Sequence, residues 1–298
     1  MKKTKLLSLL TFLLFLSLSG CQKTPEKKTP SSALPTPPSD TRNTPETITE
    51  EIFWDAKFLP LEIRYADNLT PTEQKAVKEA FSLWREEIGE NTEKTVARIQ
   101  GETPAFESEY LEDFTDNTIG IYFFKDLFPS QNKNALAITR YEGYIRYKSK
   151  TEAIITLDHA DIFVNGFTFN FTDKSTEEGE EDLSSFDFKS VLLHEMGHLL
   201  GLSHSVKNDS VMRPSITIQT VFSTLSQEDK DLIQEKYPRN SAQENMAAFS
   251  DKGQRIEIII ELKKNGEEET YFSFLGGAKE KTSSDSKISF SRLMSSRG

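Results

Sequence analysis

Three of the chain's four histidines lie within eleven residues, in the segment HEMGHLLGLSH that runs from His194 to His204. The apolar residues within this segment and in the preceding FDFKSVLL predict a buried helix. At 3.6 residues per turn, His194 and His198 lie about 40° apart around the helix axis and about 6 Å apart along it. The two imidazoles therefore share one face of the helix, which limits both the local structure and the chemistry of the chain.

This spacing fits a metal site, because both imidazoles can reach one tetrahedral ion at about 2.0–2.1 Å, the usual zinc distance. We predict one catalytic Zn²⁺ bound by His194, His198 and His204. Glu195 borders the same helix face, about 60° from His198, where it can hydrogen-bond a water at the ion. Glu195 is therefore the predicted general base. Gly201 is expected to end the helix in a left-handed conformation, which returns the chain toward the ion.

The complete pattern HExxHxxGxxH over residues 194–204 resembles the zinc signature of the metzincin peptidases. SVMRPS resembles their methionine turn and places Met212 eight residues after the last histidine. Ser205, directly after that histidine, resembles the matrixins within this class. Upstream, the segments AFSLW, ALAITR and DIFVN are similar to those of small bacterial matrixin-like domains, and the resemblance covers about residues 52–239.

The resemblance implies an α+β fold of the mixed α/β metzincin type. A twisted, mostly parallel sheet would carry an active-site helix and a second long helix, followed by a small C-terminal helical subdomain. It also implies a zinc-dependent endopeptidase that hydrolyses peptide bonds of extended protein substrates. An edge strand that includes residues 135–140 is expected to pair with the substrate backbone by β-augmentation.

The sequence departs from animal matrixins in two respects. Their propeptide cysteine has no counterpart, because Cys21 is the only cysteine of the chain. Their second, structural zinc needs several histidines, and only His159 remains outside the cluster. A structural role at a strand end is favoured for His159, and contact with substrate or an ion beside Asp158 or Asp161 is the alternative.

Two other functions remain open. One is a surface binding lipoprotein without turnover, against which Glu195 argues, because a binding module needs no base beside an open zinc. The other is a zinc amidase acting on cell-wall peptide. The net charge of −11 argues against nucleic acid as a partner, since phosphate binding needs clustered lysine and arginine. The predicted partner is a protein or peptide substrate, and a monomer is expected.

Around the histidine segment, several patterns predict regular structure. LEIRYADNL, from residue 61, alternates like a strand, and the following segment to residue 88 is a helix with Thr70 and Glu73 as its capping box. TIGIYFF, ALAITRY, EAIITL and DIFVN predict strands of one sheet. GFTFNF is expected to be extended, with Phe167, Phe169 and Phe171 on one side as a cover for the core, and a lid that contacts substrate is the alternative.

The C-terminal third contains two further patterns. TLSQEDKDLIQEKYP predicts a helix with Ser226 and Asp229 as its capping box. In the extension 241–298, two strand-like runs flank Asn265-Gly266, which predicts a β-hairpin as an appendix to a catalytic domain over residues 51–240. The acidic run 177–182 is expected to be a solvated loop, and Ca²⁺ binding there is an alternative without a fixed-spacing loop to support it.

The N-terminus is typical of an exported lipoprotein. Three lysines precede an apolar run over residues 6–18, which is too short to span a membrane, although a short anchoring helix is the alternative. LSGC over residues 18–21 resembles a bacterial lipobox, so Cys21 is the predicted lipidation site after a signal peptide over residues 1–20. Residues 21–50 are a Pro-rich tether. The lipid would hold the protein at the bacterial cell surface or the outer membrane.

Overall fold

The computed structural model describes residues 49–88, 96–114, 116–147, 152–174, 184–214, 216–237, 253–263 and 268–274. Cys21, the predicted signal peptide, nearly all of the predicted tether, the acidic run and Asn265-Gly266 lie outside these ranges. Within them, no helix is long and apolar enough to cross a membrane. The described residues from Thr49 to Phe274 belong to one compact unit, which includes the C-terminal hairpin.

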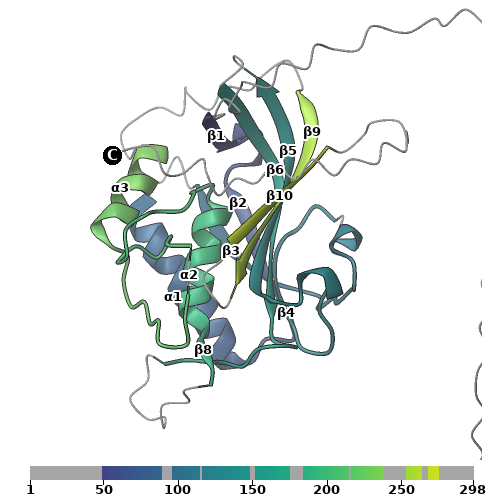
Figure 1. Cartoon of the computed structure of the whole chain (residues 1–298), viewed down its shortest axis with the longest axis vertical. Coiled ribbons are helices and arrows are strands. Elements are labelled where there is room, and N and C mark those ends of the chain that lie inside the picture. The colour runs from purple at the N-terminus through teal and green to yellow at the C-terminus, as the bar shows by residue number, and fades with distance from the viewer. Residues whose placement is uncertain are drawn as a thin grey trace, which may run out of the picture. The chain divides into compact units, whose positions relative to one another are not determined.

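A twisted eight-stranded sheet is the centre of the domain (Figure 1). Its order is β10-β9-β5-β6-β4-β2-β3, and β1 also pairs with β6. The pairs among β1, β2, β3, β4 and β6 are parallel, whereas β5, β9 and β10 pair antiparallel. The strands are β1 Thr49–Trp54, β2 Leu61–Ala66, β3 Ala97–Thr103, β4 Ile119–Phe124, β5 Ala135–Tyr147, β6 Glu152–Asn165, β9 Gln254–Lys263 and β10 Glu268–Phe274.

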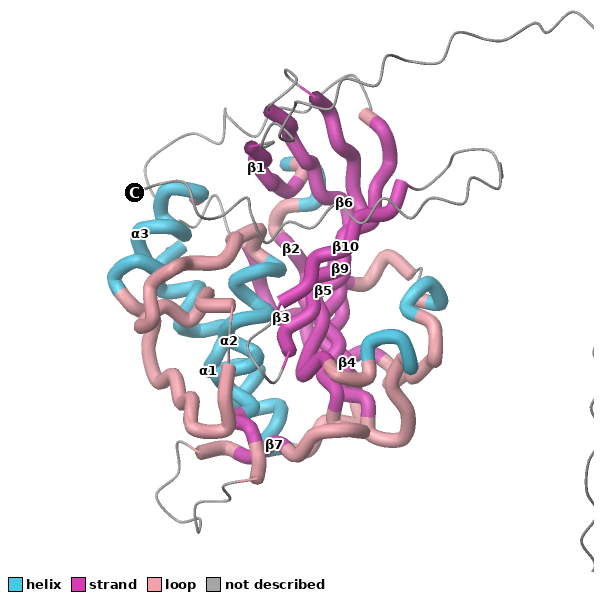
Figure 2. Tube along the Cα trace, in the orientation of Figure 1, coloured by secondary structure: helices cyan, strands magenta, loops and turns pink. Residues whose placement is uncertain are grey.

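Three α-helices lie on one side of this sheet (Figure 2). They are α1 Pro71–Ile88, α2 Phe188–Leu199 and α3 Gln227–Lys236. Short elements complete the domain: η1 Ala56–Phe58, η2 Leu111–Asp113, η3 Ser130–Asn132, and the two-residue strands β7 Phe171–Thr172 and β8 Phe186–Asp187, which pair with each other. The predicted α+β class, with its mostly parallel sheet and second long helix, is confirmed.

Helix α1 begins where its sequence predicts. The Thr70 amide donates to Glu73 Oε2 at 2.7 Å, and the Glu73 amide donates to Thr70 Oγ1 at 3.3 Å, so the capping box forms. Its apolar face is buried, and Trp84 has no exposed surface. The Trp84 indole N–H donates to the carbonyl of Leu193 at 2.9 Å, which ties α1 to α2. This hydrogen bond satisfies the polar atom of a buried tryptophan and fixes the position of α2 relative to α1.

The segment GFTFNF does not form the extended run that its alternation predicts. Asn165 closes a turn directly after β6, because its side-chain oxygen accepts from the Thr168 amide at 2.9 Å and its carbonyl accepts from the Phe169 amide at 3.2 Å. Phe167 is consequently 57% exposed, whereas Phe169 and Phe171 pack against the core. Only two of the three aromatic rings therefore cover the core as predicted.

The predicted C-terminal hairpin forms, since β9 and β10 pair antiparallel. Strand β9 also pairs with β5 from Ala135 to Ile145, so the hairpin continues the main sheet. The prediction that residues 135–140 form an edge strand is therefore wrong. The physical reason lies in β9, whose alternate residues Ile256, Ile258, Ile260 and Leu262 are buried and would be exposed if the strand stood apart.

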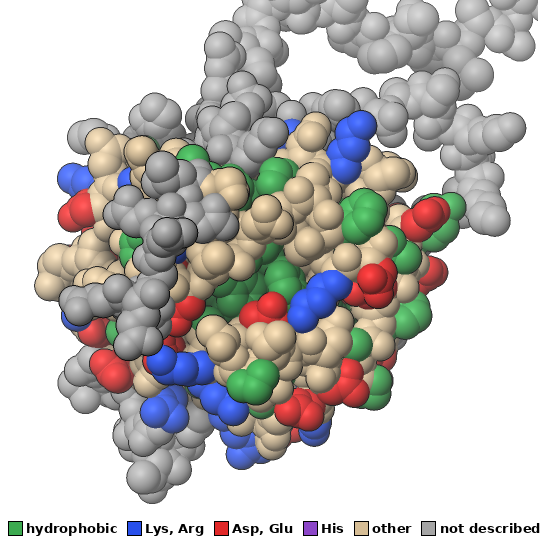
Figure 3. Space-filling view, turned by 90° about the horizontal axis from the view of Figure 1, so that it is seen from below, with side chains coloured by type: hydrophobic (Ala, Val, Ile, Leu, Met, Phe, Trp, Pro, Cys, Tyr) green, Lys and Arg blue, Asp and Glu red, His purple; other side chains and the backbone are tan. Residues whose placement is uncertain are grey.

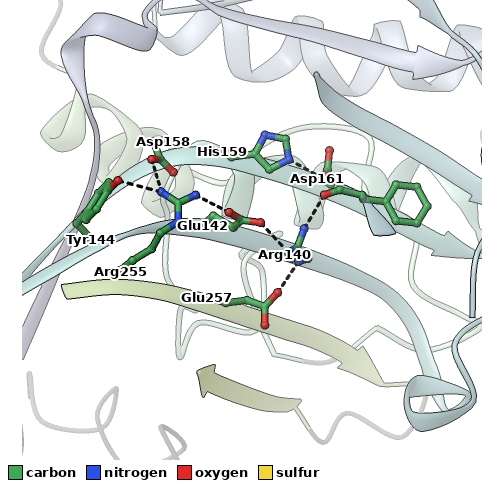
Figure 4. Close-up of polar contacts among 9 residues, drawn as sticks. Arg140, Glu142, Tyr144, Asp158, His159, Asp161, Arg255 and Glu257 are labelled. Carbon is green, nitrogen blue, oxygen red and sulfur yellow. Dashed lines mark hydrogen bonds and ion pairs between the residues drawn. The ribbon is translucent and has the colours of Figure 1, made fainter. Parts of the chain in front are cut away.

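His159 lies in a group of polar side chains shared by β5, β6 and β9 (Figure 4). Its Nε2 lies 2.8 Å from Asp161 Oδ2, and the side chain is buried. The other Asp161 oxygen accepts from the Gly120 amide on β4 at 2.9 Å. The His159–Asp161 pair therefore links β6 to β4, which fits a structural role, but His159 lies within β6 and not at a strand end as predicted.

A pH dependence of stability follows from this pair. Burial lowers the pKa of His159, but the hydrogen bond and charge of Asp161 outweigh it, with Glu142 adding to and Arg140 opposing the rise, so the folded pKa lies above the ordinary 6.5. A raised histidine pKa contributes stability that is complete below the unfolded pKa and is lost as pH rises through the folded pKa. When the pH is raised from about 6 to about 9, the free energy of unfolding should fall further for the parent chain than for the His159→Gln variant. Parallel pH slopes in denaturant titrations would contradict this assignment.

Candidate active site

Helix α2 carries the predicted metal ligands and lies at the centre of the domain. Asp187 caps it, since its carboxylate accepts from the Ser190 amide at 2.8 Å. Every residue from Phe188 to Leu199 is buried. A helix that is buried on all sides is held rigidly by its neighbours, and this rigidity fixes the directions of His194 and His198.

The helix ends in a Schellman motif at Gly201. Its φ is +84°, a left-handed conformation that favours glycine. The Leu202 amide donates to the carbonyl of Gly197 at 2.9 Å, and the Gly201 amide donates to that of His198 at 2.5 Å. The chain thereby reverses direction and brings His204 back beside the helix.

The three histidines converge through one nitrogen each. His198 Nε2 lies 3.0 Å from His194 Nε2 and 2.9 Å from His204 Nε2, and the remaining pair is 3.3 Å apart. Three ligands around a tetrahedral zinc at about 2.0–2.1 Å would be about 3.3 Å apart. The residues present therefore fit a zinc ion, and this is the one such histidine, cysteine and carboxylate group found in the described part of the chain.

The surroundings of the imidazoles keep them in the form that binds a metal. His194 Nδ1–H donates to the Val211 carbonyl at 2.8 Å, and His198 Nδ1–H donates to the Leu202 carbonyl at 2.9 Å, which leaves each Nε2 with its lone pair. Burial lowers the pKa of His194 to about 4 and holds those of His198 and His204 well below the ordinary value. Neutral imidazoles near pH 7 are ready to coordinate without losing a proton.

Met212 lies beneath the ligand helix with no exposed surface. Its carbonyl accepts from the Ser205 amide at 2.9 Å, which joins the turn to the segment after the third histidine. The methionine sulfur packs closely against Gly197, where a Cβ would lie 2.1 Å from it. The turn therefore leaves no room for a side chain at position 197 of the helix.

Asp229 has a second role that its capping motif did not reveal. It forms the predicted box with Ser226, and the same carboxylate accepts from the Val211 amide at 3.0 Å and from Ser210 Oγ. Val211 in turn accepts from His194, so α3 supports the first metal ligand through the methionine turn. The capping-box pattern located Asp229, but a local motif carries no signal for a contact with residue 211.

Glu195 lies where a general base is expected. Thr139 on β5 donates to Glu195 Oε2 at 2.5 Å, while Glu195 Oε1 is buried and has no hydrogen-bond partner in the described structure. Burial raises the pKa of Glu195 to about 8, and the Thr139 hydrogen bond opposes the rise. A neighbouring divalent cation would lower this pKa and favour the carboxylate. Thr139 escaped the sequence analysis because a lone threonine in an apolar strand gives no functional signal.

Little of this site is open to solvent. His194, Glu195 and His198 have no exposed surface, and His204 is partly exposed. On the face drawn in Figure 3, side chains border a hollow with a hydrophobic floor, and no histidine is visible there. Of the three histidines, only His204 therefore retains exposed surface.

Three converging histidines, a flanking glutamate and a methionine turn beneath the ligand helix, within an α+β domain, define a metzincin site. A family model described as Matrixin matches residues 54–238, which is more than half of the chain. The chain belongs to the matrixin family of metzincin metallopeptidases.

Curated relatives agree with this assignment. Metalloendoproteinase 1 of Glycine max is 47% identical over 57 residues, covering 19% of each protein. A putative matrix metalloproteinase of Trichoplusia ni ascovirus 2c is 27% identical over 172 residues, covering 56% of this chain and 32% of the relative. Metalloendoproteinase 2-MMP of Arabidopsis thaliana is 42% identical over 66 residues, covering 20% of this chain and 18% of the relative. The chain thus matches a third or less of the length of each relative.

Proposed function

We propose that this protein is a zinc-dependent endopeptidase that hydrolyses peptide bonds of extended protein substrates. The observation that carries the proposal is the convergence of three Nε2 atoms within 3.3 Å of one another beside a buried glutamate. A structural zinc site would use all four positions for protein ligands, whereas three histidines leave one position for water and substrate. The donor set therefore favours catalysis over a purely structural role.

Different residues of the chain have different roles in the proposed reaction. Zinc, when bound, supplies a Lewis acid for the scissile carbonyl and acidifies the attacking water. Glu195 Oε1, which has no hydrogen-bond partner among the described residues, accepts the proton of that water and passes it to the leaving amine. Thr139 holds the other oxygen of the carboxylate and fixes its orientation. Asp229 and Val211 hold His194 in place through the methionine turn.

Further parts of the proposal concern where the enzyme acts. We propose that Cys21 carries a lipid after export, that the protein is a monomer anchored at the bacterial cell surface or outer membrane, and that residues 21–50 space the catalytic domain from the membrane. The lipobox-like LSGC and the proline content of the tether support this arrangement. Membrane fractionation of the chain and of Cys21→Ala tests it, since loss of the cysteine should release the protein.

Metal removal is the direct test of the proposed activity. The purified chain should contain about one zinc and cleave casein, and a chelator should abolish cleavage until zinc is returned. The melting temperature should fall on chelation, because an ion that binds only the folded state at about 100-fold its Kd contributes about 2.7 kcal/mol. Zinc without cleavage would favour a binding role or a cell-wall amidase, which cell-wall peptides would then distinguish. Absence of zinc binding would overturn the proposal.

A further inference from the structure

Strand β9 lies on the side of β5 that faces away from β6, and β5 is the strand that contacts the catalytic glutamate. Thr139 of β5 donates to Glu195, and Ile260 of β9 is its direct partner across the ladder. Neighbouring strands are about 4.8 Å apart. The backbone of β9 near Ile260 is therefore one strand spacing from the residue that touches Glu195.

The geometry of β9 is that of an extended peptide added to a sheet. It runs antiparallel to β5 and pairs with it from Ala135 to Ile145. Extended peptides are recognised in this way, because the main chain provides hydrogen bonds and alternate side chains enter pockets. A substrate that extends along β5 to present a peptide bond at Glu195 would need the hydrogen-bonding edge that β9 now holds.

The side chains of β9 also occupy the face that a substrate would use. Residues directly opposed in an antiparallel pair lie on the same face of the sheet. Ile258, Ile260 and Leu262 therefore share the face of Tyr141, Thr139 and Ala137, the face on which Thr139 meets Glu195. All three apolar residues are buried, with Leu262 at 0% exposure. Alternate apolar side chains of β9 are thus buried on the sheet face that carries Thr139.

Ion pairs on the opposite face hold β9 to β5 (Figure 4). Arg140 Nε of β5 donates to Glu257 Oε1 of β9 at 2.6 Å. Arg255 of β9 donates to Glu142 at 2.5 Å and to Asp158 at 2.8 Å. Because desolvation offsets much of the attraction in a buried ion pair, such contacts specify register more than they add stability. These ion pairs and the ladder hydrogen bonds are all noncovalent.

We propose that β9 is an internal pseudosubstrate that occupies the β5 edge and must be displaced before a peptide is cleaved. The inference rests on the proposed endopeptidase function and adds its regulation and the kind of peptide it accepts. The displacing peptide is extended and carries apolar side chains at alternate positions, since these take the places of Ile258, Ile260 and Leu262. Acidic side chains between them face Arg140, as Glu257 does.

A reversible lock tests this directly in the full chain. Ala135 and Lys263 are partners in the ladder and lie outside the site, so Ala135→Cys with Lys263→Cys can be oxidised to tie β9 to β5. The oxidised form should cleave casein at least about tenfold more slowly than the reduced form, because fewer molecules have a free β5 edge that can bind substrate. Zinc content should be equal in both. Lys263→Cys alone is the control, and equal cleavage by the locked and reduced forms overturns the inference.

Loosening the strand gives the opposite effect. Arg255→Glu places a negative charge against Glu142 and Asp158, so backbone amides of residues 254–263 should exchange hydrogen faster and casein cleavage should rise by about threefold or more. Arg98→Glu makes the same charge change on β3, away from β5, and is the matched control. Faster exchange without faster cleavage would contradict the pseudosubstrate role.

A binding measurement separates this inference from the proposed function. A fluorescent peptide of residues 254–263 should bind to Arg255→Glu and fail to bind to the oxidised lock. If no form cleaves casein, the endopeptidase proposal fails, and this binding difference alone decides whether the β5 edge is a docking site. Equal binding to both forms, or binding to neither, rejects β9 as a displaceable strand.

Discussion

Replacement of Glu195 by Gln is expected to lower kcat for casein cleavage by about 10²–10⁴-fold, the usual contribution of a general base. Glutamine has the same shape and can still accept the Thr139 hydrogen bond, but it cannot take a proton from water. Zinc content should be unchanged, because the ligands His194, His198 and His204 are untouched. The variant therefore separates the chemical step from metal binding and from folding.

Two measurements serve as controls for this prediction. The melting temperature of Glu195→Gln should equal or exceed that of the parent, since a buried carboxylate oxygen without a partner costs free energy that a neutral amide reduces. His198→Ala is the companion variant, and it should lose zinc and cleavage together. Residual cleavage within about tenfold of the parent in Glu195→Gln would show that another group serves as the base.

Gly197→Ala is expected to destabilise the protein, although alanine ordinarily favours a helix over glycine by about 1 kcal/mol. A Cβ at this position would lie 2.1 Å from Met212 Sδ and 3.0 Å from Trp84 Cζ2. Methionine is flexible, but Met212 and Trp84 are fully buried and have little room to move. Overpacking of this kind costs about 1–3 kcal/mol, which outweighs the helix preference. Zinc affinity should fall as well, because displacement of α2 moves His194 and His198.

A double variant identifies the cause. Met212→Ala creates space beneath the helix, so Gly197→Ala should cost less in that background, with a coupling energy of about 1 kcal/mol or more in denaturant unfolding. Gly197→Ala alone should also raise the zinc concentration needed for half-maximal activity. An unchanged or raised melting temperature for Gly197→Ala would show that the methionine turn accommodates the added methyl group without loss of stability.

Local patterns predicted the regular elements well. The capping boxes at Thr70 and Ser226 formed, and Gly201 adopted the left-handed conformation expected after the ligand helix. These signals succeed because the groups that satisfy one another lie within a few residues of chain. GFTFNF shows the limit of such patterns: an alternation of aromatic residues predicts a strand, but one asparagine side chain diverts the backbone into a turn.

The sequence by itself determined how the three histidines and Glu195 are grouped, because they are placed by the period of one helix and one turn. The tertiary structure decided what surrounds them. Thr139 reaches Glu195 from a strand 56 residues away, and β9 returns from the C-terminus to pair with β5. Pairing between distant strands depends on which edge can bury an apolar face and satisfy its backbone, and no local period encodes that choice. Whether the site is open or covered therefore depends on which strands pair in the folded sheet.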